Sequence, residues 1–154
     1  MRQIYHAIEL ISLIKRLIDE LGNEQKDLGS KFRARARFLP QMILDTGLLS
    51  TLSFCFGKIT LENYSKLLTY ILLGNDLQVL KNISSEALSY GLYLYGILDY
   101  LRKINLITDD LVQDPFKALD YLEKENRANT ATNLLLPFII EVKKLAEAIF
   151  KEEG

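Results

Sequence analysis

The sequence has very few of the residues that build metal centres and nucleophilic active sites. Cysteine and histidine occur once each, as Cys55 and His6, and tryptophan is absent. A zinc centre needs several Cys or His ligands, and a nucleophilic Cys or Ser needs a base beside it. The carboxylates near residues 109 to 114 lie at expected helix starts, where Asp usually caps the helix. The sequence therefore predicts no catalytic residue, no metal site and no cofactor.

The single cysteine also bears on location. Cys55 has no partner for an internal disulfide, which suits a reducing compartment, and its place on an apolar helical stripe predicts a small core residue. The N-terminal segment is amphipathic and has no small-residue cleavage site, so we expect a helix there and not a signal peptide. The most apolar run, residues 87 to 101, includes Asp99 and is shorter than the ~20 residues that span a bilayer. We therefore expect a cytoplasmic protein with no membrane partner.

The alternation of polar and apolar residues that marks a half-buried strand is nearly absent. The exception is RARARF at residues 33–38, where a strand would place its three arginines on one face. In a helix, the same region instead places Leu28, Phe32, Ala36 and Leu39 in one buried stripe, and its charge density favours this helix. The sequence predicts an all-α fold, as a single compact bundle of about six to seven helices that forms one domain over residues 1–154.

Start and stop signals divide the chain into the expected helices. They run from about residue 4 to 21, 24 to 38, 40 to 57, 61 to 73, 85 to 101, 116 to 125 and 132 to 149. Pro40 is expected in the first turn of the third helix, and Asp114 is expected to cap the sixth. NRANTA, residues 126–131, is expected to be the connector before the last helix.

Several side chains are expected in particular environments. Ile4 and Ile8 belong to the expected apolar seam of the first helix. Gly47 is expected where a neighbouring helix packs close to the backbone. The tyrosines of residues 90 to 100 are expected mainly in the core, with Tyr93 or Tyr100 reaching the surface.

Charge is locally concentrated although it is balanced overall. The chain is 49% hydrophobic and 25% charged, with a formal net charge of −1. Residues 24–37 carry five basic and two acidic side chains, a net charge of +3, whereas residues 109–125 carry six acidic and two basic ones, a net charge of −4. Nucleic-acid binding would therefore depend on a local basic patch, since overall attraction is absent. A solvated helix surface remains the alternative interpretation of this cluster.

Two stretches of the sequence carry a family resemblance. The basic cluster is followed in order by Leu39-Pro40, Met42-Ile43, Gly47-Leu48, Thr51-Leu52, Phe54 and Lys58. At the far end, FIIEVKKLAEAIFKEE, residues 138–153, combines an apolar residue, a basic pair, an apolar residue and Ala-Glu-Ala. In both stretches the chain resembles the small α-helical subunit of type III-B CRISPR effector (Cmr) complexes.

The resemblance implies a non-catalytic subunit that stacks in the inner filament of a ribonucleoprotein and adds basic surface to the target-RNA channel. Its partners would be the backbone and large subunits, copies of itself, and guide and target RNA. Six RNA-binding candidates match basic positions of the family, namely Arg33, Arg35, Arg37, Lys58, Lys143 and Lys144. Lys26 and Lys31 join them because they lie on the shoulders of the same predicted helix, Lys26 with Arg33 and Arg37, and Lys31 with Arg35.

Three other functions stay open from the sequence. The chain is compatible with a helical protein-protein interaction module that binds no nucleic acid. It is also compatible with the small subunit of the related type III-A complex. An enzyme with an unrecognised site is the third, although no constellation of residues supports it.

Overall fold

The computed structural model describes residues 2–75 and 77–152, and this part of the chain is helical with no strand. The elements are α1 (Gln3–Leu21), η1 (Gly22–Gln25), α2 (Leu28–Thr46), α3 (Leu48–Ile59), α4 (Leu61–Leu73), α5 (Leu77–Leu80), α6 (Ser85–Lys103), α7 (Asp109–Gln113), α8 (Pro115–Lys124) and α9 (Ala128–Ile149). The all-α prediction is confirmed. The nine α-helices of the described residues exceed the expected six to seven, because the short α5 and α7 form in segments expected to be connectors.

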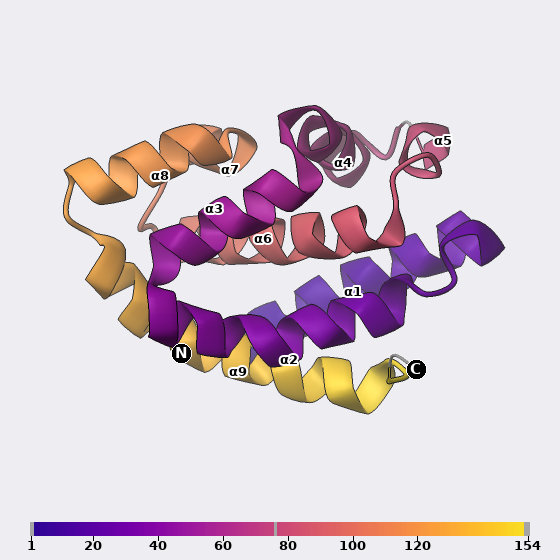
Figure 1. Cartoon of the computed structure of the whole chain (residues 1–154), viewed down its shortest axis with the longest axis horizontal. Coiled ribbons are helices and arrows are strands. Elements are labelled where there is room, and N and C mark those ends of the chain that lie inside the picture. The colour runs from indigo at the N-terminus through magenta and orange to yellow at the C-terminus, as the bar shows by residue number, and fades with distance from the viewer. Residues whose placement is uncertain (1, 76, 153–154) are drawn as a thin grey trace.

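Helix α6 forms the centre of the molecule. Every residue from Leu88 to Leu101 is buried, so α6 is covered all round. Figure 1 shows α1, α2 and α9 side by side beneath α6, with α3 crossing it and α4, α7 and α8 further out. No helix in the described part of the chain is long and apolar enough to cross a membrane.

Helix α1 buries most of the expected apolar seam, including Ala7, Ile11 and Ile14, but not its first and third members. Ile4 and Ile8 are about half exposed, and Leu10 and Leu17 are buried instead. The reason lies on α6, where Gly96 has no side chain. A Cβ atom at residue 96 would lie 2.5 Å from Leu10 Cδ2, closer than real contacts allow. The Leu10 side chain of α1 therefore packs on α6, whereas most of the buried side of α1 faces α9.

Helix α2 continues through Pro40, so the predicted helix start at this residue is wrong. Proline removes one backbone donor from the helix interior. The apolar stripe nevertheless continues from Leu39 to Ile43, both of which are buried, and this packing maintains the helix. Helix α2 ends at Gly47, whose φ of +96° suits glycine and whose N–H donates to the Ile43 carbonyl at 2.9 Å. Gly47 is thus a helix stop, and no neighbour lies within 4 Å of the position its Cβ would take.

Other sequence expectations are confirmed or corrected in the core. Cys55 is fully buried, and burial raises the pKa of its thiol to about 12. Tyr93 and Tyr100 are both 2% exposed, so the expectation that one would reach the surface is wrong. Tyr100 stacks on Phe138 of α9 with ring centroids 4.2 Å apart. The last helix begins at Ala128, inside the expected connector.

Candidate nucleic-acid interface

Arg33 is an intramolecular cap for the last helix. Its Nη1 atom donates to the carbonyl of Glu147 at 2.7 Å and to that of Phe150 at 3.0 Å. The last carbonyls of a helix have no intrahelical donor and carry partial negative charge, so a guanidinium there satisfies both needs. Arg33 is therefore partly buried where α2 meets the C-terminal end of α9. Its guanidinium already has hydrogen-bond acceptors within the chain.

The C-terminal segment is held in place by Phe150. This residue leaves the helix in an extended conformation, with φ −98° and ψ 149°. Its ring packs edge-on against Phe32 and fills the space beside Gly29, where a Cβ would lie 2.9 Å from Phe150 Cδ1. Glu153, the last residue of the pattern noted in the sequence, lies outside the described residues. The segment from Phe150 to Glu152 thus lies along α2.

Arg37 lies one turn beyond Arg33, on the same face of α2. Its Nη1 atom lies 3.3 Å from Glu152 Oε1, and its Nε atom lies 3.8 Å from Glu147 Oε2. The side chain remains 56% exposed. Arg37 therefore presents a charged group to solvent while two carboxylates of the C-terminal region lie beside it.

Lys26 and Lys31 border a shallow depression next to the same segment. It has a volume of about 550 Å³ and is also lined by Ile149, Phe150 and Lys151. Lys26 is exposed and Lys31 is partly buried. Lys26 and Lys31, near the start of α2, therefore border the same depression as Lys151, which follows α9. We call Lys26, Arg33 and Arg37 the α2 basic face, because Lys31 is two residues before Arg33 and so projects from a different side of α2.

Arg35 lies on the other side of α2, against α6. Its Nε atom donates to Ser89 Oγ at 3.2 Å, and its guanidinium carbon lies 4.2 Å from the centre of the Tyr90 ring. Only 12% of the side chain is exposed. Lys58, in the last turn of α3, reaches the same tyrosine, with Nζ 5.8 Å from its ring centre. The structure therefore brings these two cations together, but apart from the α2 basic face.

Lys143 and Lys144 point in different directions on α9. Lys143 is partly buried and lies one turn before Glu147, on the side of α9 that meets α2. Lys144 is exposed and pairs with Glu141 at 3.2 Å. The basic pair of the sequence thus places one lysine beside the α2 basic face and the other away from it. The contact of any of these eight residues with RNA stays a prediction.

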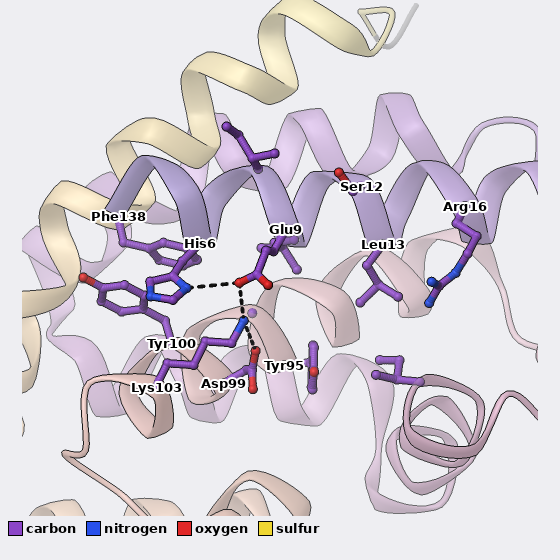
Figure 2. Close-up of a pocket in the computed structure, with 14 residues that line it drawn as sticks. His6, Glu9, Ser12, Leu13, Arg16, Tyr95, Asp99, Tyr100, Lys103 and Phe138 are labelled. Atoms are coloured by element: carbon purple, nitrogen blue, oxygen red, sulfur yellow. Dashed lines mark hydrogen bonds and ion pairs between the residues drawn. The ribbon is translucent and has the colours of Figure 1, made fainter. Parts of the chain in front are cut away.

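Sequence reasoning missed a charged pocket between α1 and α6. Lys103 Nζ lies 2.9 Å from Glu9 Oε1 and 3.0 Å from Asp99 Oδ2, and His6 Nδ1 lies 3.1 Å from the same Glu9 oxygen (Figure 2). Asp99 also pairs with Arg102, at 2.5 Å. These groups border an open depression of about 390 Å³. Glu9 and Lys103 are 94 residues apart, so no spacing in the sequence could reveal the pair.

The pocket links α1 to α6 electrostatically. The hydrogen bond from Lys103 lowers the pKa of Glu9. Burial acts to lower the pKa of Lys103, but its bonds to Glu9 and Asp99 outweigh burial and raise it. Burial and the charge of Asp99 raise the pKa of Tyr95, at the floor of the pocket, to about 12. Each charge in this group has an opposite neighbour, which is the arrangement expected of a structural clamp. Within the described residues, no group of three or more His, Cys, Asp or Glu is placed to hold a metal ion.

The comparisons with known proteins cover nearly the whole chain. A family model described as CRISPR-associated protein (Cas_Cmr5) matches residues 6–149. A curated relative, the CRISPR system CMR subunit Cmr5 of Saccharolobus solfataricus, is 29% identical over 148 residues, which is 94% of this chain and 91% of the relative.

Two solved structures have a similar fold. One is a chain of the Type III-B Cmr-beta complex bound to cognate target RNA and AMPPnP, with a TM-score of 0.74 and 24% identity over 99% of this chain and 98% of the other. The second is a chain of the Cmr-beta complex bound to non-cognate target RNA, with a TM-score of 0.76 and 23% identity over 99% of both chains. At these identities the likeness establishes the fold.

Proposed function

Because the chain belongs to the CRISPR-associated Cas_Cmr5 family, we propose that it acts as a non-catalytic subunit that stacks in the inner filament of the effector complex. The family match confirms the resemblance to the small subunit of type III-B complexes. It also favours type III-B over the related type III-A complex. In the proposed role the protein contributes basic surface to the channel for the target RNA. Its proposed partners are the other subunits, copies of itself, and the guide and target RNA, in the cytoplasm.

The observation that carries this proposal is the family match over residues 6–149. The solved chains of similar fold belong to Cmr-beta complexes bound to target RNA, which supports transfer of these partners to this chain. The separate assignment of a non-catalytic role rests on the sequence, in which His6 and Cys55 lack the neighbours that a nucleophilic site needs.

The α2 basic face is the part of the surface best suited to a phosphate backbone. Arg37 is more than half exposed, and its planar guanidinium offers paired donors to a phosphate. Lys26 is exposed in the turn two residues before the same helix begins. Arg33 and Arg35 have partners within the chain, so we assign them mainly to positioning. Arg33 fixes the end of α9 beside Arg37, and Arg35 fixes α2 on α6.

A helical interaction module without nucleic acid is the second candidate. It is favoured by large apolar side chains that remain on the surface, among them Leu44 of α2, Leu73 of α4 and Phe116 of α8, each more than 60% exposed. Partner subunits would cover such residues, and the proposed filament subunit also requires protein contacts. The two functions differ in whether RNA lies against α2.

Site-specific crosslinking within the assembled complex distinguishes them. A photoreactive benzoylphenylalanine would replace Gln41, which is exposed one turn beyond Arg37 on the same helix face. The matched control would replace Gln113, which is exposed at the end of α7. We expect target RNA to crosslink at position 41 and not at position 113. Crosslinks to protein alone from position 41 would favour the interaction module.

The non-catalytic role needs a separate test. The purified chain should leave target RNA intact. Complexes assembled with and without this chain should cut the target RNA at the same positions. Cleavage by the isolated chain that a point substitution in this chain abolishes would overturn the assignment.

A further inference from the structure

The arginine that best suits RNA is also the one that the C-terminal carboxylates approach. Arg37 lies 3.3 Å from a Glu152 oxygen and 3.8 Å from a Glu147 oxygen. Carboxylate and phosphate oxygens use the same donors of a guanidinium. A phosphate and Glu152 therefore compete for the Arg37 guanidinium, and both cannot accept from the same N–H donors.

We propose that the C-terminal segment is an electrostatic latch, in which Glu152 holds Arg37 in the absence of RNA and a backbone phosphate of the bound strand displaces it. This inference rests on the proposed function, because it concerns the same basic face. The ligand is a phosphodiester group of single-stranded RNA, and the carboxylate of Glu152 stands in its place in the free chain.

The latch has a fixed end and a movable end. Phe150 is the fixed end, because its ring packs on Phe32 and beside Gly29, and its carbonyl accepts from Arg33. Glu152 is the movable end, since its side chain is 71% exposed and it lies two residues beyond the last anchored residue. Displacing Glu152 would leave the packing of Phe150 intact. RNA binding therefore needs no unfolding of α9.

The arrangement also predicts that a continuous strand displaces Glu152 at lower concentration than a single anion does. An exposed ion pair changes an equilibrium constant by no more than about fivefold, so Glu152 is easily displaced. A lone phosphate gains little from displacing it. A strand that also contacts Lys26 gains a second neutralised phosphate and releases further counterions. The latch should thus lower the affinity of an isolated anion and of a continuous strand by a similar factor, and the strand overcomes this cost because of its further contacts.

The test measures the affinity of the assembled complex for target RNA with Glu152→Gln, Arg37→Gln and the two combined. The matched control is Glu123→Gln, which removes one exposed carboxylate from α8, away from α2. We expect Glu152→Gln to raise affinity by about two- to fivefold, the range that corresponds to an exposed ion pair. Glu123→Gln should leave affinity within about 1.5-fold of the unmodified complex, because it changes only the distant charge. Arg37→Gln should abolish the gain from Glu152→Gln, because the two residues act on each other.

The outcomes separate this inference from the proposal on which it rests. If Arg37→Gln weakens binding while Glu152→Gln behaves like the Glu123 control, the latch is wrong and the basic face stands. If Arg37→Gln leaves affinity unchanged both with and without Glu152→Gln, Arg37 does not contact RNA, and the latch fails with it. All three substitutions are at exposed side chains, and incorporation of each of the four variants into the complex would be checked by mass.

Discussion

Gly91 lies so close to Ile59 that a Cβ atom at residue 91 would be 2.0 Å from Ile59 Cδ1. This contact sets the distance between α3 and the central helix α6. Ile59 is fully buried, and Leu67 Cδ2 lies 3.3 Å from the same Cβ position, so little space is available for a shift. The close approach requires glycine at residue 91 for packing, and a left-handed backbone is not the reason.

A pair of Gly→Ala substitutions tests this packing. Gly91→Ala should destabilise the protein, because overpacking costs about 1 to 3 kcal/mol and exceeds the gain in helix propensity of up to about 1 kcal/mol. Gly57→Ala in α3 is the matched control, since a Cβ there meets no atom within 4 Å. It should be neutral or stabilise by up to about 1 kcal/mol. Urea unfolding of both variants measures the difference, and equal stability would contradict this account of the α3–α6 contact.

A second pair concerns buried tyrosine hydroxyls. Tyr93 Oη is buried and has no hydrogen-bond partner among the described residues, whereas Tyr64 Oη donates to the Val112 carbonyl at 2.7 Å. Tyr93→Phe should therefore leave the free energy of unfolding unchanged or raise it, because it removes an unsatisfied polar atom. Tyr64→Phe should lower it by about 1 to 3 kcal/mol, because a buried carbonyl loses its donor. Thermal unfolding in which Tyr93→Phe is the more damaging change would contradict this prediction.

Arg33 should contribute more to the stability of the protein than to RNA binding. Arg33→Ala removes two charge-assisted hydrogen bonds from the end of α9 and should cost about 1.5 to 3 kcal/mol. Lys144→Ala, at an exposed residue of the same helix, should change stability by less than about 0.5 kcal/mol. Hydrogen exchange at residues 146 to 150 should accelerate in the Arg33 variant alone. Unchanged exchange there would show that the cap contributes little.

The pocket of Figure 2 predicts a defined pH dependence. The pKa of Glu9 is lowered in the folded state from its ordinary value of 4.5, so its stabilising contribution is present above pH 4.5 and is lost as the pH falls through the folded pKa. The pKa of Lys103 is raised from 10.5, so its contribution is present below pH 10.5 and is lost as the pH rises through the folded value. Glu9→Gln should therefore flatten the acid side of the stability profile. Identical acid limbs for the variant and the unmodified protein would exclude this role for the Glu9–Lys103 pair.

The sequence predicted local structure well where one stripe of residues decided it. The stripe of Leu28, Phe32, Ala36 and Leu39 identified α2 as a helix, and all four residues are fully buried. The cap at Asp114 was also predictable, because a side chain and the N–H of residue 117 lie in one turn. These features depend on residues a few positions apart.

Tertiary contacts explain what the sequence could not predict. Proline is common at helix starts, but Pro40 lies inside α2 because Leu39 before it and Ile43 after it are buried in one core. The sequence alone suggests that Arg33 is a surface charge. Its acceptors, the carbonyls of Glu147 and Phe150, lie more than 110 residues later in the chain. The same holds for the pairing of Glu9 with Lys103. The basic cluster could therefore be located from the sequence, but its division into an exposed Arg37 and the partly buried Arg33 and Arg35 could not.

The salt dependence of RNA binding tests the central claim most directly. The measurement compares complexes assembled with Lys26→Gln/Arg37→Gln and with Lys117→Gln/Lys124→Gln, which removes two charges from exposed residues of α8 instead. Each neutralised phosphate of a single strand contributes roughly 0.7 to the slope of log affinity against log salt. If α2 lines the path of the target RNA, the first double variant should bind more weakly and flatten the slope by about 1.4, while the second should match the unmodified complex. Equal affinities and slopes for the two double variants, with normal assembly of both, would contradict the assignment of the α2 basic face to RNA.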